Sequence, residues 1–437
     1  MSAVELVTLA TCDLGAIVRG RAVAAAELGR HLTAGVSWVP ANQSLTPLGP
    51  LAEQSPFGST GDLRLVPDTT THVKVEGEAE HSALELVLCD IAETDGRPWA
   101  ACPRRFLREA LEQLRRELGA SVHASFEHEF QLLREERPAL PFSLEAQRRA
   151  EPLPGRLMGA LAEADLEPER FFAEYSSHQF EIPVAPAEGL AAADRAVVFR
   201  EVVREVARRC GLRATFTPLL DPEQAGNGVH VHLALRGADG ESVLYDVAGP
   251  AQLSEVGASF AAGVLRHARA LSALTAPSPV SATRLSPHRW SAGAVCLAER
   301  NREALLRIPP LVELGGDAPE AQMRLEYRGA DASANPYLTL GAVLLAGLQG
   351  VRERLPAPPV LDRDPGELDE AEARRFGVGA LPASLEESLQ ALAADDVARA
   401  WLAPLLYDAY TGIKQAELDA AAASELEEVC RRYALIY

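Results

Sequence analysis

Residues 122–133 read VHASFEHEFQLL, and apolar and polar side chains alternate along most of this stretch. Alternation with a period of two is typical of a β-strand with one buried face. The buried face would carry Val122, Ala124, Phe126, Phe130 and Leu132. The opposite face would carry His123, Ser125, Glu127, Glu129 and Gln131. Residues two apart on a strand lie roughly 7 Å apart, so Glu127 and Glu129 can flank a pair of cations but repel each other when unpaired.

Three further segments alternate in the same way and also carry charged or imidazole side chains on their polar faces. These segments are residues 178–184, 228–235 and 321–328. Their polar residues are Gln179 and Glu181, with Glu174 just upstream, then His230 and His232, then Arg324, Glu326 and Arg328. Each segment alone also fits an ordinary strand with a solvated face.

Taken together, the four segments share one chemistry. Carboxylates with one or two imidazoles are ligands suited to Mg²⁺ or Mn²⁺. Arginines beside them can bind phosphate or carboxylate through paired hydrogen bonds. Metal-assisted phosphoryl transfer from ATP requires this combination, because the metals neutralise phosphate oxygens and the arginines stabilise charge on the transferring group.

The composition limits the classes of partner. A length of 437 residues allows a large core and more than one domain. The formal net charge of -20 argues against a nucleic-acid or anionic-membrane partner. Six cysteines without a CxxC pair indicate reduced thiols. We find no signal peptide and no apolar run long enough to span a membrane, so we expect a cytoplasmic protein.

The spacing of apolar residues changes near residue 100. Residues 1–100 contain short apolar runs broken by Gly and Pro, which predict a small β-rich domain. Residues 101–437 contain helical spacing as well, and we expect one larger domain there. Helices are predicted at residues 104–118, 254–274 and 336–348, and at residues 194–209 with Asp194 as the N-cap.

The chain resembles the glutamine synthetase superfamily over nearly its whole length. The motifs that carry the resemblance are GDLRLVPD (61–68), FEHEF (126–130), EYSSHQFEI (174–182), GNGVHVHLAL (226–235), NREALLRIP (301–309), RLEYRGADASANPYL (324–338) and LPASLEESLQAL (381–392). Several motifs in the family's order are far more specific than any one of them. The resemblance implies an α+β fold, with an N-terminal β-grasp domain and a catalytic domain in which helices surround a curved antiparallel sheet.

The family's functional residues carry over to matching positions. One cation would be held by Glu129, Glu174 and Glu181, and another by Glu127, His230 and Glu326, with two or three Mg²⁺ or Mn²⁺ ions per site. ATP would contact His232, Arg302, Arg307 and Arg324. The substrates would contact Gly226, His230, Arg284, Trp290 and Arg328. Glu129, Arg302 and Arg328 are the residues expected to act most directly in the reaction.

The resemblance also implies the reaction and its partners. ATP would phosphorylate the side-chain carboxylate of glutamate, and a nitrogen nucleophile would then displace phosphate to form an amide. The partners would be glutamate, an amine and ATP, with no nucleic acid and no membrane. Family members form rings in which one subunit completes the site of the next, so a homo-oligomer is expected, as a dodecamer of two hexameric rings.

Two departures from the family pattern affect the nucleophile. Members that use ammonia carry an aspartate in the N-terminal domain and a glutamate in a flap loop. Here residues 40–58, PANQSLTPLGPLAEQSPFG, contain no aspartate, and the flap SPHRWSAG (286–293) places Trp290 where the glutamate would align. A tryptophan offers an apolar wall or a π face for an alkylammonium group.

Smaller departures concern the substrate loops. Ser177 and His178 stand where Pro-Gly is usual, and Ala225 replaces an asparagine that helps frame the amino-acid substrate.

Three hypotheses follow for the function. The first is a ligase that forms a γ-glutamyl amide from glutamate and an organic amine, similar in character to the γ-glutamyl-amine and γ-glutamylpolyamine ligases. The second is an ammonia-dependent glutamine synthetase with a rebuilt ammonium site, in which Trp290 only packs the flap. The third is an inactive relative with a binding or structural role, which the complete set of aligned ligands disfavours. The sequence does not name the amine.

Overall fold

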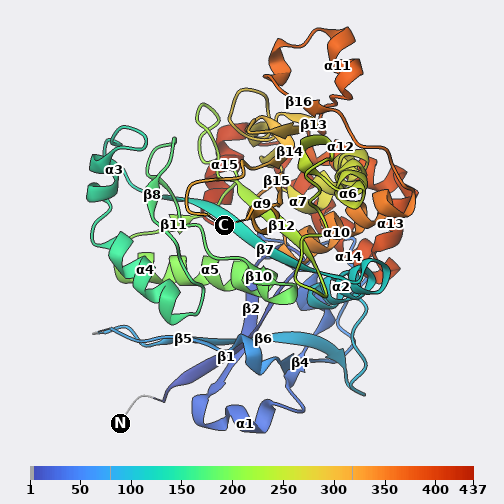
Figure 1. Ribbon diagram of the computed structural model, residues 1–437. Helices are drawn as coiled ribbons and strands as arrows, with labels where there is room; N and C mark the ends of the chain where they lie inside the picture. The colour runs from blue at the N-terminus through green and yellow to red at the C-terminus, as the bar shows by residue number, and fades with distance from the viewer. Residues whose placement is uncertain (1–3, 79, 317) are drawn as a thin grey trace.

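The computed structural model describes residues 4–78, 80–316 and 318–437 and contains two β-sheets with helices around the second (Figure 1). The first sheet has six strands in the order β2-β1-β6-β4-β3, with β5 also paired to β6. Its strands are β1 (Leu6–Cys12), β2 (Val18–Ala24), β3 (Val36–Trp38), β4 (Leu63–Pro67), β5 (Val73–Val75) and β6 (Leu84–Glu93). Only β1 and β6 pair in parallel among these strands.

The second sheet has ten strands in the order β16-β13-β14-β15-β12-β7-β9-β8, with β10 and β11 also paired to β7. Its strands are β7 (Ala120–Leu132), β8 (Phe172–Ala173), β9 (Gln179–Glu181), β10 (Ala187–Glu188), β11 (Ala214–Thr215), β12 (Val229–Gly237), β13 (Ala294–Glu299), β14 (Ala304–Ile308), β15 (Leu325–Ala330) and β16 (Val360–Leu361). Pairing is antiparallel from β14 to β8, whereas β13 pairs in parallel with β14 and β16.

Helices cover the apolar face of this sheet. Those nearest the core are α2 (Pro103–Leu118), α5 (Leu190–Arg209), α6 (Glu255–Arg266), α7 (Ala268–Thr275) and α10 (Pro336–Arg352). The others are α1 (Leu28–His31), α3 (Leu144–Arg149), α4 (Leu153–Glu163), α8 (Ser281–Arg284), α9 (Pro319–Gln322), α11 (Glu370–Phe376), α12 (Leu385–Ala394), α13 (Asp396–Trp401), α14 (Pro404–Ala421) and α15 (Leu426–Ala434). Helix α10 is buried on nearly every side, as expected for a helix that is apolar all round.

Each alternating segment contains a strand, but two strands are shorter than predicted: β9 covers only Gln179–Glu181 of 178–184, and the segment 321–328 begins in α9, with β15 starting at Leu325. The predicted buried face of β7 is buried, and its polar face is half-buried except at Gln131, which is buried.

Two helix predictions were wrong in detail. The helix predicted at 254–274 breaks at His267, which ends α6 and begins α7. Asp194 does not cap a helix, because α5 begins four residues earlier and Asp194 lies inside it.

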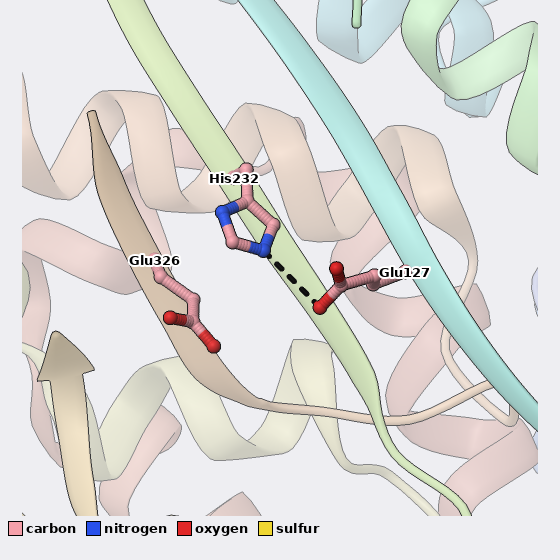
Figure 2. A group of neighbouring side chains, drawn as sticks. All are labelled: Glu127, His232 and Glu326. Atoms are coloured by element: carbon pink, nitrogen blue, oxygen red, sulfur yellow. Dashed lines mark hydrogen bonds and ion pairs between the residues drawn. The ribbon is translucent and has the colours of Figure 1, made fainter. Parts of the chain in front are cut away.

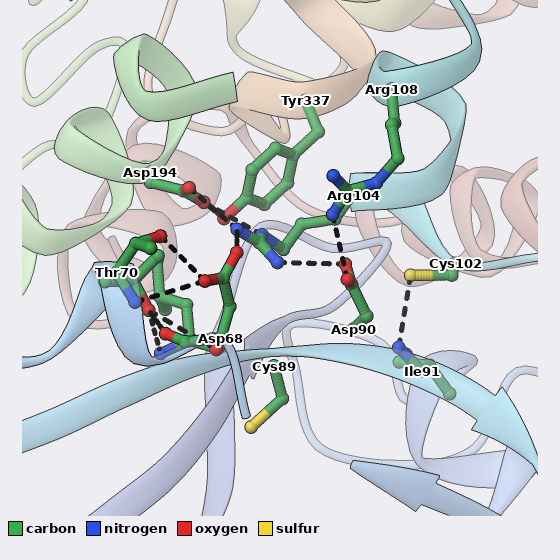
Figure 3. A network of polar contacts seen from close by, with 12 residues as sticks. Asp68, Thr70, Cys89, Asp90, Ile91, Cys102, Arg104, Arg108, Asp194 and Tyr337 are labelled. Carbon is green, nitrogen blue, oxygen red and sulfur yellow. Dashed lines mark hydrogen bonds and ion pairs between the residues drawn. The ribbon is translucent and has the colours of Figure 1, made fainter. Parts of the chain in front are cut away.

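Asp194 instead belongs to a buried polar network centred on Arg104, which joins the first sheet to the helices (Figure 3). The guanidinium of Arg104 bonds Asp68 at 3.0 Å, Asp90 at 2.9 Å and both oxygens of Asp194 at 2.9 and 2.8 Å. The hydroxyl of Tyr337 donates to Asp194 at 2.6 Å. Because these residues come from β6, α2, α5, α10 and the turn after β4, the network ties five segments together.

A second buried ion pair lies within α14 and supports a prediction about stability. Lys414 Nζ lies 2.7 Å from Glu417 Oε1, both side chains are fully buried, and the Tyr433 hydroxyl donates to Glu417 at 2.6 Å. Replacing Lys414 by methionine would leave Glu417 buried without a counter-charge, so we expect a loss of about 3–5 kcal/mol in the free energy of unfolding. Urea denaturation measures this loss. The double variant Lys414→Met/Glu417→Leu should lose less, and equal losses in the two proteins would contradict the explanation.

Candidate active site

The register of the second sheet brings the polar faces of four strands together. Glu127 on β7 lies opposite His230 on β12, and Glu129 on β7 lies opposite Glu181 on β9. Glu326 on β15 lies opposite His232 on one side and Arg307 on β14 on the other. Residues up to two hundred positions apart in the chain therefore meet on one face, because each strand keeps its polar side chains on that face.

A cavity of about 990 Å³ opens over this face. Every predicted site residue lines it: Glu127, Glu129, Glu174, Glu181, Gly226, His230, His232, Arg284, Trp290, Arg302, Arg307, Arg324, Glu326 and Arg328. The cavity is thus bordered by carboxylates on β7, β9 and β15, by imidazoles on β12 and by arginines from several segments.

His232 and two of the glutamates, Glu127 and Glu326, form a close group (Figure 2). Arg324 Nε donates to His232 Nδ1 at 3.3 Å, and His232 Nε2 lies 3.2 Å from a Glu127 oxygen. His230 Nδ1 lies 3.4 Å from the same Glu127 oxygen and 3.9 Å from Glu326.

Among the residues that the structure describes, two sets of side chains have ligand atoms within 4.8 Å of one another, close enough to hold a metal ion. They are Glu127, His232 and Glu326, and Glu127, Glu181 and His230. These sets share four residues of the predicted ligand sets, but they group them differently and place Glu127 in both. The chemistry of the donors fits divalent cations with oxygen and imidazole ligands.

The pKa values of the glutamates are shifted in opposite directions in two parts of the site. Burial and the nearby Glu129 carboxylate raise the pKa of Glu174 to about 8, and burial with three neighbouring carboxylates raises the pKa of Glu181 well above its usual value. Burial would also raise the pKa of Glu326, but Arg328 and the histidines outweigh it and lower that pKa to about 2. For Glu174 and Glu181 the nearby arginines do not offset burial and the neighbouring carboxylates, whereas for Glu326 they do, and a bound cation would supply the missing compensation.

Two of the arginines that line the cavity each have a buried N–H group without a partner among the described residues. The Nε atoms of Arg284 and Arg307 have no hydrogen-bond partner among the residues that the structure describes. One other nitrogen of each side chain is bonded: Arg307 Nη1 donates to Glu326 at 2.6 Å, and Arg284 Nη2 donates to the Ala330 carbonyl at 2.7 Å. Buried donors without partners are rare, so both atoms fit a site that receives an anionic group.

The loop of residues 286–293 lies at the mouth of the cavity. The Trp290 side chain is 63% exposed, and its ring lies against Tyr175, with centroids 6.0 Å apart and planes at 33°. Phe142 also lines the cavity and is 55% exposed. Sequence reasoning missed Tyr175 and Phe142 as wall residues. Tyr175 stands inside a quoted motif beside Glu174, which is a usable signal, whereas Phe142 lies outside every motif.

Comparisons with known proteins agree with this geometry. Models of the glutamine synthetase N-terminal domain and of the glutamine synthetase catalytic domain match residues 1–99 and 100–433. The gamma-glutamylpolyamine synthetase GlnA3 of Streptomyces coelicolor is 33% identical over 421 residues, which cover 94% of this chain and 89% of that protein. A glutamine synthetase of Methanocaldococcus jannaschii is 31% identical over 370 residues, which cover 82% and 80%. A crystal structure described as a novel glutamine synthase homolog superposes with a TM-score of 0.92 at 48% identity, covering 100% of this chain and 99% of the other.

The fold, the site and these matches define an ATP-dependent carbon–nitrogen ligase. The chain belongs to the glutamine synthetase family. The predicted family, fold class and enzyme class are therefore confirmed. In the part of the chain that the structure describes, no helix is long and apolar enough to cross a membrane.

Proposed function

We propose that this ligase joins the side-chain carboxylate of glutamate to an organic amine rather than to ammonia. The observation that carries the proposal is Trp290. It stands in the flap where ammonia-using relatives have a glutamate, and its exposed ring lies at the mouth of the cavity against Tyr175. Two aromatic rings give an apolar or cationic amine a favourable surface, whereas ammonium has no apolar part to bury there.

The metal assignment remains a proposal that the site's chemistry supports. Glu129, Glu174 and Glu181 would hold one divalent cation, and Glu127, His230 and Glu326 another. Mg²⁺ and Mn²⁺ both accept these donors, and either would neutralise charge on phosphate oxygens. The raised pKa values of Glu174 and Glu181 support a cation beside them.

The arginines and His232 would bind ATP and glutamate. Arg302, Arg307, Arg324 and His232 would bind the phosphates and the nucleotide, and Arg284, Arg328 and the backbone of Gly226 would bind glutamate. The unpaired Nε atoms of Arg284 and Arg307 support anion binding at both positions. Arg328 touches Glu326 and the Trp290 carbonyl, so it lies between the proposed phosphate and amine subsites.

The reaction would have two steps. The terminal phosphoryl group of ATP passes to the glutamate side-chain carboxylate, giving an acyl phosphate and ADP. The amine nitrogen then attacks the acyl carbon, the bond to phosphate breaks, and the nitrogen loses a proton. The acyl phosphate must be kept from water, and the 286–293 loop at the cavity mouth is suited to exclude it.

An ammonia-dependent glutamine synthetase is the second candidate. The relatives include both a gamma-glutamylpolyamine synthetase and glutamine synthetases at similar identity, so similarity alone does not choose between them. Phosphate release from ATP, Mg²⁺ and glutamate, with ammonia, ethanolamine, short alkylamines, putrescine or spermidine, separates the two. A much greater stimulation by an organic amine supports the proposal, and stimulation by ammonia alone refutes it.

Replacing Trp290 by glutamate tests directly whether the Trp290 ring binds the amine. Loss of the ring should lower kcat/KM for the preferred amine by about tenfold or more, since a cation–π or apolar contact of this kind contributes up to about 2 kcal/mol. The new carboxylate should also increase activity with ammonia. Trp290→Phe, which keeps an aromatic face, is the matched control and should keep the amine profile. An unchanged profile in Trp290→Glu would mean that the tryptophan only packs the loop.

The domain boundary and the oligomeric state are further proposals. We place the domain boundary near residue 100, which the positions of the two family matches support. We also expect a homo-oligomer of the family's ring type. Light scattering on the purified protein measures its mass and tests the dodecamer.

A further inference from the structure

One side chain outside the 286–293 loop, that of Glu303, accepts hydrogen bonds from two of its backbone N–H groups. One oxygen of the Glu303 carboxylate accepts the backbone N–H of Trp290 at 2.8 Å, and the other accepts the backbone N–H of His288 at 3.2 Å. Both loop residues have positive φ, +54° for Trp290 and +62° for His288. Side chains of this size rarely adopt that conformation, so the surroundings must stabilise it.

The Trp290 peptide is fixed on its other side as well. Its carbonyl accepts from Arg328 at 3.0 Å, and Arg328 also pairs with Glu326 in the cavity. The N–H of Trp290 is thus bound by Glu303, its C=O by Arg328, and its ring lies against Tyr175. These three contacts determine where the ring stands at the cavity mouth.

The surroundings of the Glu303 carboxylate allow few substitutions at this position. A Cβ built on Gly293 would come within 2.7 Å of one Glu303 oxygen, so the loop backbone passes directly against the carboxylate. The Glu303 N–H donates to Asn301 Oδ1 at 2.9 Å, and the Asn301 amide donates to the Arg363 carbonyl at 2.8 Å, which fixes this turn in its place. The N–H groups of Trp290 and His288 need two acceptors. A glutamine at position 303 would supply only one, because its amide NH₂ group would place a donor against one of these N–H groups.

We propose that Glu303 is a positioning residue that sets the Trp290 ring as the wall of the amine subsite. It does not line the main cavity. It lines a second cavity of about 770 Å³, which shares His288, Trp290 and Arg302 with the first. Glu303 therefore acts on the amine through the loop rather than by contact. The inference rests on the proposed function in one respect, that the amine binds beside Trp290.

The kinetic test uses Glu303→Gln in the full-length protein. We expect KM for the preferred amine to rise about tenfold to a hundredfold, since a displaced positioning group costs that much, while KM for ATP and glutamate stays within about twofold. Glu299→Gln is the matched control, because Glu299 is an exposed acid lining the same second cavity. Gly293→Ala crowds the carboxylate from the loop side and should reproduce the effect of Glu303→Gln.

A second readout follows the loop itself and needs no amine. The Arg289 guanidinium donates to the carbonyls of Pro222 and Gln224, which holds the Arg289–Trp290 bond against the protein. Trypsin should cleave after Arg289 several times faster in Glu303→Gln than in wild type or Glu299→Gln. Far-ultraviolet circular dichroism of the uncleaved proteins confirms that each variant is folded.

The outcomes are distinct. Faster cleavage with a higher amine KM supports the proposal. Faster cleavage in a protein that uses only ammonia would support the positioning role and refute the proposed function. Unchanged cleavage overturns the proposal whatever the kinetics, and a fall in kcat with cleavage and KM unchanged would assign Glu303 a direct role in the reaction instead.

Discussion

Replacing Glu129 by alanine should lower ATP-dependent phosphate release by on the order of 10³-fold, because a bound cation supplies several kcal/mol of charge stabilisation in phosphoryl transfer. Two hydrogen bonds orient the Glu129 carboxylate. One of its oxygens accepts the Gly228 N–H at 2.7 Å and the Gln179 amide at 3.2 Å. These bonds fix the carboxylate between β12 and β9, so the proposed ligand is already oriented.

Two companion variants separate the loss of charge from damage to the sheet. Glu129→Gln keeps the size of the side chain but not its charge, and it should be nearly as inactive as the alanine variant. Glu188→Ala changes an exposed acid on β10, which pairs with β7 outside the cavity, and it should keep full activity. Saturating Mg²⁺ should raise the melting temperature of wild type more than that of Glu129→Ala. Turnover close to wild type in Glu129→Ala would rule out its role as a metal ligand.

Replacing Arg104 by methionine should destabilise the protein by about 3–5 kcal/mol, because three aspartates would lose a buried partner. The side chain of Arg104 is 2% exposed, and its bonds to Asp68, Asp90 and Asp194 are all 3.0 Å or shorter. Denaturant unfolding gives the free energy, and the loss should appear as a lower midpoint.

Arg108 provides the matched control. It lies one turn further along α2 and pairs with the same Asp90 at 2.8 Å, but its side chain is 45% exposed. Water screens such a pair, so Arg108→Met should cost no more than about 1 kcal/mol. Equal losses in the two variants would show that burial of the Arg104 network contributes nothing of its own.

Much of the site could be predicted from the sequence, because a strand alternates its side chains whatever surrounds it. The alternation in residues 122–133 places Glu127 and Glu129 on the face opposite Phe126, and β7 has this arrangement. The same rule located His230, His232 and Glu326 on their strands. The pairing of these strands does not follow from alternation, since register depends on contacts between segments far apart in the chain.

The errors arise where distant partners override local patterns. Asp194 is a good N-cap by its local sequence, but Arg104 and Tyr337 bind its carboxylate inside α5. Apolar spacing continues across His267, so no periodicity marks the break there. The hydrogen bond between Glu303 and the Trp290 backbone could not be predicted either, because a contact between two residues thirteen positions apart leaves no periodic pattern in the sequence.

The carboxylates and imidazoles proposed for metal binding stand on β7, β9, β12 and β15 or directly beside them, whereas Trp290 stands on a loop. Inserting one residue in β7 would turn Glu127 and Glu129 to the opposite side of the sheet, so the strands tolerate little change. The loop has no such constraint as long as Glu303 keeps its two backbone donors. Grafting the 286–293 segment from other ligases, together with residue 303, is therefore a modular route to new acceptor specificity that leaves the phosphate-activating machinery untouched.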